Sequence, residues 1–314
     1  MKFKKPKFWD FKKPNLISYL LLPFTLVVLI NNFFLRFKSK KKNKKIKSIC
    51  VGNIYLGGTG KTPTTIAIYD ILKKLKFEVS TAKKFYQNLY DENIILEKKT
   101  KFISSNNRNK ILSKGIEQKQ QIIIFDDGLQ DKNISYDIEF VCFDADNFIG
   151  NGCLIPSGPL RENLNSLKKY DAVFIKNENK IVQDQLNLIR KYNQNIKIFE
   201  TFFKIKNLNE FDLDNEYIIF SGVGNPNSFK KILINNKFKI IKEIIFADHY
   251  NYKRKEVENI LAIAKERNCK IITTEKDFVK IDKFGFTDIN FIDVDLKVKN
   301  EEKLVAFLKN KIYE

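Results

Sequence analysis

The segment "VGNIYLGGTGKTP", residues 51–63, decides the fold, because it has the composition of a loop that holds the phosphates of a nucleotide. Phosphate loops follow the pattern G-x-x-x-x-G-K-[ST], and Gly60, Lys61 and Thr62 supply its second half. The first glycine of the pattern would fall at position 55, which is Tyr55. Since the part that touches phosphate is intact, the sequence predicts a phosphate loop with an altered beginning.

Each part of this loop has an expected role. Its glycines allow backbone N–H groups to turn toward phosphate oxygens, and the helix that follows adds its positive N-terminal end. Lys61 is expected to reach the β- and γ-phosphates, and the Thr62 hydroxyl is expected to ligate Mg²⁺. The predicted nucleotide site consists of Tyr55, Leu56, Gly57, Gly58, Thr59, Gly60, Lys61, Thr62 and Pro63. The weaker alternative is a tight glycine turn without a ligand.

Apolar runs that alternate with helical stretches follow the loop. The runs "QIIIFDD" (121–127), "EFVCFDA" (139–145) and "DAVFIKN" (171–177) are typical of strands buried on both faces. This alternation predicts an α/β fold of the phosphate-loop type, with a mostly parallel sheet and helices on both faces. Ligands of such sheets bind at the carboxyl ends of the strands.

A smaller α/β unit is expected to begin near residue 206. Residues 217–233 predict a strand, a glycine-rich turn and a helix, and residues 254–281 predict a helix, a strand and a turn. The expected domains are a membrane-associated helix with basic flanks in 1–47 and a phosphate-loop core in 48–205. A smaller domain in 206–314 would close the cleft over the site.

The N-terminal segment is strongly apolar. No residue from Pro14 to Leu35 is charged, and these 22 residues are long enough to cross a bilayer, which needs about 20. However, Pro23 interrupts the segment, and lysines on both sides define no inside and outside. We therefore favour a helix that lies in the cytoplasmic face of a membrane, with lysines at anionic headgroups. A spanning helix and a buried soluble helix are the alternatives.

The overall charge favours anionic partners. Lysine and arginine number 57 against 37 acidic residues, a formal net charge of +20. Acidic lipid, a phosphorylated substrate and nucleic acid all fit such a field, as does a general abundance of lysine. No nucleic-acid-binding motif accompanies the charge, so nucleic acid is not expected. The four cysteines form no C-x-x-C pair, which indicates neither a zinc site nor a disulfide framework.

Acidic residues at the ends of expected strands are candidates for a metal site. Asp126 and Asp127 end a buried strand in "IIIFDDGLQ", where a carboxylate is placed to hold Mg²⁺ or its water. In "GPLRE", Glu162 is a further candidate ligand and Arg161 a candidate contact for the transferring phosphate. A local salt bridge between the last two is the alternative. Lys276 in "TTEKD" is a candidate contact for nucleotide or acceptor.

Six motifs occur in a fixed order: "VGNIYLGGTGKTP", "IIIFDDGLQ", "GNGCLIPSGPLRE", "GVGNPNSF", "FADHYNY" and "TTEKDFVKI". Together they resemble the tetraacyldisaccharide 4′-kinases, over nearly the whole chain. The loop of that family also lacks the first glycine. The resemblance implies ATP, Mg²⁺ and an anionic glycolipid acceptor, a lipid A disaccharide 1-phosphate whose 4′-hydroxyl receives the γ-phosphoryl group. It also implies the cytoplasmic face of the inner membrane, with a peripheral (monotopic) or single-helix-anchored protein.

The resemblance also implies catalytic roles. Asp91 and Glu92 match the acidic motif of the family, and Asp91 is thereby expected to be the catalytic base. His249, the one histidine of the chain, matches a "DH" signature and would orient that base. Lys61 and Arg161 are the other expected catalytic residues. The expected acceptor-binding or supporting residues are Glu92, Arg108, Gln130 and Lys276.

The chain departs from the family at three places. The stretch before Asp91 is shortened to "AKKFYQNLY" (82–90), in which Tyr86 is matched to a tyrosine of the family. Cys153 stands where arginine is usual, and Asp131 where histidine is frequent. Contacts made by the family from the shortened stretch are therefore not carried over to this chain.

A different class of protein shares part of the pattern. Partition-type ATPase switches that associate with membranes also contain "GGTGKT". They carry a signature lysine before the glycine pair, and that position is Leu56 here. They also do not account for "GPLRE" or "DHYNY", so this class is the alternative function.

Overall fold

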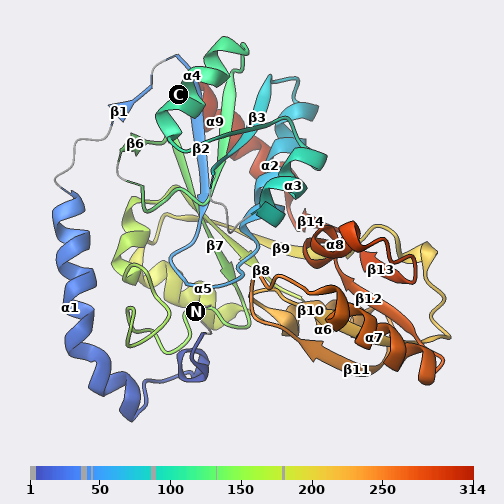
Figure 1. The fold of residues 1–314 in the computed structure, drawn as a ribbon. Coiled ribbons are helices and arrows are strands. Elements are labelled where there is room, and N and C mark those ends of the chain that lie inside the picture. Colours follow the sequence, from blue (N-terminus) through green and yellow to red (C-terminus); the bar gives the residue numbers. More distant parts are fainter. Residues whose placement is uncertain (1–4, 37–40, 44, 86–89, 132, 179–180) are drawn as a thin grey trace. The chain divides into compact units, whose positions relative to one another are not determined.

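The structure is a computed structural model that describes residues 5–36, 41–43, 45–85, 90–131, 133–178 and 181–314 (Figure 1). The described residues form two compact units. The larger unit contains Lys5–Phe85, Lys99–Phe202 and Lys297–Glu314, and the smaller unit contains described residues of Tyr86–Lys98 and Phe203–Leu296. Strands β9 and β14 contribute residues to both units.

The larger unit is built on an eight-stranded sheet with the order β14-β9-β8-β7-β2-β5-β3-β4. The strands from β9 to β4 pair in parallel throughout. Their bounds are β2 Lys47–Gly52, β3 Val79–Lys84, β4 Phe102–Ser105, β5 Ile122–Asp126, β7 Ile138–Asp144, β8 Ala172–Lys176, β9 Lys197–Ile205 and β14 Val294–Val298. A separate parallel ladder joins β1 (Lys41–Lys42) and β6 (Ile134–Ser135).

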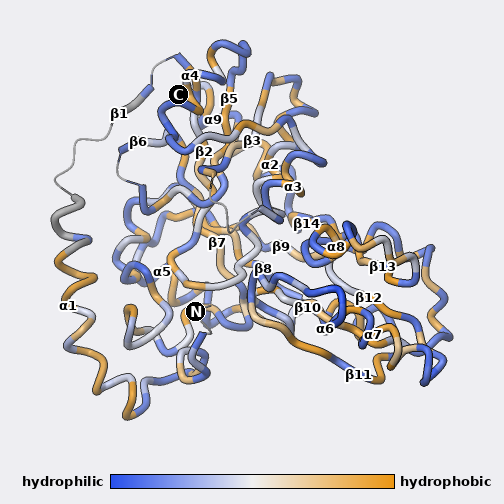
Figure 2. The backbone as a smooth tube through the Cα atoms, viewed as in Figure 1, coloured by the Kyte–Doolittle hydropathy of each residue, from blue (hydrophilic) through white to orange (hydrophobic). Residues whose placement is uncertain are grey.

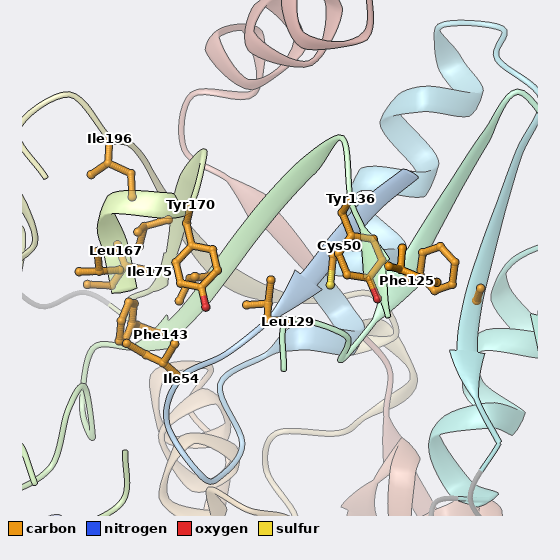
Figure 3. Close-up of a cluster of buried hydrophobic side chains, with 14 of the residues drawn as sticks. Cys50, Ile54, Phe125, Leu129, Tyr136, Phe143, Leu167, Tyr170, Ile175 and Ile196 are labelled. Atoms are coloured by element: carbon orange, nitrogen blue, oxygen red, sulfur yellow. The ribbon is translucent and has the colours of Figure 1, made fainter. Parts of the chain in front are cut away.

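Helices cover both faces of this sheet. The apolar sides of α2 (Lys61–Lys74) and α9 (Glu301–Tyr313) pack on one face. Helices α4 (Arg108–Glu117), η3 (Leu164–Lys169) and α5 (Gln183–Tyr192) pack on the other. Figure 3 shows part of this second core, in which the rings of Phe125 and Tyr136 lie 5.3 Å apart beside Cys50. The two buried cores hold the carboxyl ends of the strands in place around the phosphate loop.

The smaller unit has its own parallel sheet, with the order β11-β10-β12-β13. Helix α6 packs on one face, and α7 and α8 pack on the other. All of α3 except its last residue, Lys99, also belongs to this unit. The bounds are α3 Tyr90–Lys99, η4 Leu208–Glu210, β10 Glu216–Ser221, α6 Pro226–Asn235, β11 Lys239–Ile245, α7 Arg254–Glu266, β12 Lys270–Thr274, α8 Glu275–Ile281, η5 Asp282–Phe284 and β13 Ile289–Ile292.

The predicted fold class is confirmed: the chain is α/β, with mostly parallel sheets covered on both faces. The compact units differ from the expected division into 48–205 and 206–314 at two places. Helix α9 lies in the larger unit, because Leu304, Leu308 and Ile312 complete the core against α2. The segment that carries Asp91 lies in the smaller unit.

The N-terminal segment forms η1 (Lys7–Asp10) and the 21-residue helix α1 (Leu16–Arg36), with Pro23 inside the latter. Hydrophobic residues line much of α1 (Figure 2), and many of them are exposed. In the described part of the chain, no helix combines the length and apolar character needed to cross a bilayer.

Candidate active site

The phosphate loop lies between β2 and α2, at the carboxyl end of a central strand of the larger sheet. Gly60 precedes the helix with a φ of 83°, in the left-handed region that disfavours side chains. Buried Asn53 braces the loop from inside, since its amide donates to the Gly57 carbonyl (3.2 Å) and to the Thr59 hydroxyl (3.1 Å). The local geometry therefore directs Lys61 and Thr62 to the start of α2, as a phosphate site requires.

Tyr55 occupies the position of the absent glycine and faces the N-terminal segment. Its buried phenol donates to Asp10 Oδ1 (2.7 Å) and accepts from Lys5 Nζ (3.0 Å). Burial and the neighbouring Asp10 carboxylate raise the pKa of this phenol well above its ordinary value. The altered beginning of the loop is thus an anchor to residues far upstream in the chain.

Asp126 ends β5 directly beside the start of α2. Its Oδ2 accepts from the Thr62 hydroxyl (2.8 Å) and from Lys83 Nζ (2.7 Å), and the carboxylate is fully buried. Its Oδ1 is buried with no hydrogen-bond partner among the described residues. A buried acceptor oxygen beside a threonine hydroxyl fits a cation such as Mg²⁺ or its water shell.

Lys83 is a site residue that none of the sequence motifs indicates. It lies near the end of β3, is 2% exposed and forms an ion pair with Asp126. The available signal was its position near the end of a strand, at the sheet edge where ligands of this fold bind.

The Asp127 carboxylate forms ion pairs with two cationic side chains, one at each of its oxygens. Lys61 Nζ lies 3.8 Å from its Oδ2, and Arg161 lies 3.4 Å from its Oδ1. Arg161 also donates to Gln130 Oε1 (3.2 Å). Four of the predicted site residues therefore lie together in the larger unit: Lys61, Asp127, Gln130 and Arg161.

Glu162 is held by protein donors. Its carboxylate accepts from Lys169 (2.6 Å), from the Tyr170 hydroxyl (3.2 Å) and from Gln130 (3.1 Å). Among the described residues no cluster of three or more His, Cys, Asp or Glu side chains has the arrangement of a metal site. The role of Glu162 as a metal ligand stays a prediction.

Arg108 supports the turn that carries the two aspartates. Its buried guanidinium forms an ion pair with Asp131 and donates to the Asp127 carbonyl (2.6 Å). The family that this chain resembles often has histidine at the position of Asp131. The aspartate found here provides the ion-pair partner of Arg108. In this chain Arg108 fixes the backbone beside the phosphate loop.

The smaller unit brings Asp91 and His249 into contact, although they are 158 residues apart. Asp91 lies in the first turn of α3 with 4% of its surface exposed, and its two oxygens lie 3.2 and 3.1 Å from His249 Nδ1. His249 has a φ of 54°, and its N–H donates to the Gly222 carbonyl (3.1 Å). This turn aims the imidazole at the carboxylate. Tyr86, matched to the family upstream of Asp91, lies outside the described residues.

Two lysines of α8 complete this cluster. Lys276 Nζ lies 3.8 Å and Lys280 Nζ 3.2 Å from Asp91 Oδ2. Lys276 also donates to Glu92 Oε1 (3.1 Å) and lies 3.2 Å from His249 Nε2. Lys280 was not predicted, although it follows Lys276 by one helical turn and so shares its face.

The electrostatics of the cluster keep Asp91 ionised. Burial raises the pKa of its carboxyl, but the His249 hydrogen bond and the charges of Lys276 and Lys280 outweigh burial and lower the pKa to about 2. For Lys276, burial lowers the pKa, but Glu92, Asp248 and Asp91 outweigh it and raise the pKa above its ordinary value. The cluster thus presents an oriented carboxylate with permanent positive charge beside it.

One cavity of about 480 Å³ lies elsewhere in the larger unit. It is lined by the beginning of β9, the end of β14 and parts of α5 and α9, including Lys197, Phe199, Val298 and Phe307. Since β9 begins there, this cavity lies at the amino end of the parallel strands. It contains none of the predicted site residues.

Comparisons with known proteins identify the family of the chain. Residues 16–88 and 78–313 match the family described as tetraacyldisaccharide-1-P 4′-kinase. A protein of Pelagibacter ubique (strain HTCC1062) named tetraacyldisaccharide 4′-kinase is 44% identical, over 97% of this chain and 96% of its own length. A protein of the same name from Rickettsia akari (strain Hartford) is 35% identical over the same shares.

The fold is similar to that of a solved structure. LpxK from Aquifex aeolicus, crystallised in complex with ATP, superposes with a TM-score of 0.70 at 22% identity. The match covers 95% of this chain and all of that chain. Both units of the chain therefore have counterparts in one known architecture.

Proposed function

The chain belongs to the tetraacyldisaccharide-1-P 4′-kinase family, and on that basis we propose that it transfers the γ-phosphoryl group of ATP to the 4′-hydroxyl of a tetraacyldisaccharide 1-phosphate. The observation that carries the proposal is the buried Asp91 carboxylate, held by His249 in a chain that also has a phosphate loop. The alternative, a partition-type ATPase switch, transfers the phosphoryl group to water, and its motifs do not account for "DHYNY", which carries His249.

The larger unit supplies the phosphate-binding half of the reaction. Lys61 and the N–H groups at the start of α2 bind the β- and γ-phosphates. Arg161, held beside Asp127, stabilises charge on the transferring phosphoryl group. Gln130 and Arg108 keep these groups in place through the contacts described above.

Thr62 and Asp126 are the residues that would hold Mg²⁺, with Asp127 next to them. The buried Asp126 oxygen without a hydrogen-bond partner in the described chain supports this assignment. When bound, the ion would neutralise charge on the phosphates of ATP.

The smaller unit supplies the base. The 4′-oxygen of the acceptor attacks the γ-phosphorus, the bond from that phosphorus to the ADP oxygen breaks, and the hydroxyl proton passes to the Asp91 carboxylate. His249 Nδ1 orients the carboxylate, and Lys276 offers positive charge to an anionic substrate group. A hydroxyl of high pKa needs such a base in position as the new P–O bond forms.

The N-terminal segment suits a glycolipid acceptor. Helix α1 exposes large apolar side chains such as Leu16, Leu20 and Val27, and lysines lie on both sides of it in the sequence. Apolar side chains with flanking lysines suit a helix that lies in the interface of an anionic membrane. We place the protein at the cytoplasmic face of the inner membrane, where ATP is available.

The test is a transfer assay with purified protein, ATP labelled at the γ-position and a tetraacyldisaccharide 1-phosphate in mixed micelles. The expected product carries one added phosphate at the 4′-position, and its formation depends on acceptor concentration. Label released as inorganic phosphate at the same rate with and without acceptor would favour the ATPase switch instead. The matched control is Lys61→Ala, which removes the charge partner of the β- and γ-phosphates.

A further inference from the structure

The side of α1 that faces the protein is a polar stripe. Ser18, Thr25 and Asn32 recur every seven residues, and Ser18 and Thr25 are buried. Leu20 follows Ser18 by two residues and is 67% exposed, and Val27 follows Thr25 by two residues and is 69% exposed. The helix thus has its polar face toward the protein and its apolar face outward, the reverse of a surface helix in a soluble protein.

Two members of this stripe hold residues 151–162, which we call the arginine loop because it ends with Arg161 and Glu162. Ser18 Oγ accepts from the Asn151 side chain (2.9 Å), and the Ser18 carbonyl accepts from the Ser157 hydroxyl. Near the other end of α1, the Asn32 amide donates to the carbonyl of Arg161 (3.2 Å). Helix α1 therefore bonds to both ends of the loop.

The chain before α1 makes a second connection. Trp9 is buried and its indole N–H donates to the Pro156 carbonyl (3.0 Å), inside the arginine loop. Asp10, the next residue, accepts from the Tyr55 phenol at the beginning of the phosphate loop (2.7 Å). The N-terminal segment, residues 5–36, is thus bonded to both loops that carry phosphate-binding groups.

The two loops are also bonded to each other. The backbone N–H of Arg161 donates to the Ile54 carbonyl (2.7 Å), and that of Leu56 donates to the Pro159 carbonyl (2.8 Å). A displacement of the arginine loop would therefore displace the beginning of the phosphate loop, and a displacement of the phosphate loop would displace the arginine loop.

From these contacts we propose that the N-terminal segment is a positioning element for phosphoryl transfer, in addition to its expected role at the membrane. Asn32 holds the backbone of Arg161, and Tyr55 ties the phosphate loop to Asp10. This inference rests on the proposed function, since it assigns the two side chains to the geometry of that reaction. It also gives a physical reason why a tyrosine stands at the position of the first glycine.

The test separates positioning from folding and from membrane attachment. Asn32→Leu removes the hydrogen-bond donor and leaves a side chain that is compatible with the helix. Asn32→Gln retains an amide donor. Tyr55→Phe retains the aromatic ring and removes the hydroxyl. Thr25→Val is the matched control, because the Thr25 hydroxyl donates to the helix's own Leu22 carbonyl. The measurements are kcat and KM in mixed micelles, the dissociation constant of a fluorescent ATP analogue, and thermal unfolding followed by circular dichroism.

We expect Asn32→Leu to lower kcat by roughly 2- to 10-fold with a nearly unchanged KM for the lipid, as the loss of one neutral hydrogen bond allows. Asn32→Gln should recover most of the loss, and Tyr55→Phe should weaken binding of the ATP analogue by about the same factor. Thr25→Val should match the wild type. Equal kcat in Asn32→Leu and wild type, together with equal ATP affinity in Tyr55→Phe, would overturn the proposal.

Failure of the proposed function gives a different result. If the wild type transfers no phosphate to the lipid, that function is wrong, while weaker binding of the ATP analogue by Tyr55→Phe still supports positioning. A kcat loss in Asn32→Leu that glutamine does not recover, or that follows a lower unfolding temperature, would assign Asn32 to structure and contradict its positioning role.

Discussion

Replacing Asp91 with asparagine is expected to lower kcat by about 10²- to 10⁴-fold, the usual contribution of a general base. The substitution keeps the size of the side chain and removes its capacity to accept a proton. The KM for ATP should change little, because the predicted nucleotide site, residues 55–63, does not include Asp91. His249→Ala should cost less, since the imidazole acts through the carboxylate.

The structure sets the magnitude for His249. The pKa of Asp91 is lowered from 3.8 to about 2, and this difference corresponds to about 2–3 kcal/mol in favour of the charged form. The favourable part is shared by His249, Lys276 and Lys280, while burial opposes it. Since the carboxylate is already ionised at working pH, the kcat loss in His249→Ala comes from lost orientation, and the loss of one hydrogen bond to a charged group should lower kcat by about 10-fold or more.

The same change has a signed effect on pH dependence. In the wild type Asp91 is deprotonated above about pH 2, so its titration leaves no acid limb in kcat at working pH. Removing His249 raises the folded-state pKa of Asp91, because a group that lowers it is lost while burial remains. The base is lost as pH falls through that higher pKa, so the acid limb of His249→Ala should appear at higher pH.

The assay is a double-mutant cycle on kcat, at saturating ATP and lipid, with Asp91→Asn, His249→Ala and the double variant. The double variant should be little worse than Asp91→Asn, because residues that act as one unit are not additive. Asp214→Asn is the control, since Asp214 is an exposed acid of the same unit. Fully multiplicative losses would show two independent roles, and an active Asp91→Asn protein would refute the assignment of the base.

Three further results are expected. Lys61→Ala should abolish measurable transfer in the micelle assay while the thermal unfolding temperature stays near that of the wild type. Changing Leu20 and Val27 together to glutamine should move much of the protein from the membrane pellet to the supernatant on sedimentation, because two outward apolar contacts are lost. Lys83→Met should lower the free energy of unfolding in urea by about 3–5 kcal/mol, because it leaves the buried Asp126 charge without its ion pair.

Each of these has a control and a contrary result. Normal turnover in Lys61→Ala would contradict the phosphate-loop assignment. Thr25→Val, on the protein-facing side of α1, should sediment like the wild type, and unchanged sedimentation of the glutamine variant would place the membrane contact elsewhere. Lys101→Met changes an exposed lysine of the same unit, and a stability loss there equal to that of Lys83→Met would remove the argument from burial.

The elements that were predictable from the sequence are those whose signal is local. The phosphate loop, the buried strands and their acidic ends each occupy a few consecutive residues, and the α/β class follows from how they alternate. Contacts between distant residues were not readable in this way. The contact of Asp91 with His249 was expected only through the family resemblance, because nothing in the spacing of the two residues indicates it.

Lys83 and Tyr55 show a second limit. Lys83 lies in a chain rich in exposed lysines, and composition cannot reveal that this one is buried against Asp126. The substitution at Tyr55 was visible, but its partner Asp10 lies 45 residues upstream, in a segment interpreted only for its relation to the membrane. Tertiary packing decides both cases, and a periodic pattern carries no information about it.

The order of the two units along the chain has a consequence for protein synthesis. The smaller unit is mostly one continuous stretch, Phe203–Leu296, and the larger unit continues after it with α9. Leu304, Leu308 and Ile312 of α9 pack into a core begun by residues of β2 and α2. On the ribosome, the stretch within Phe203–Leu296 is therefore complete before the core of the nucleotide-binding unit can close. Until α9 is synthesised, one apolar face of the larger sheet is incompletely covered. A nascent chain with such exposed apolar surface is prone to aggregate, so chaperone binding is most needed during this interval.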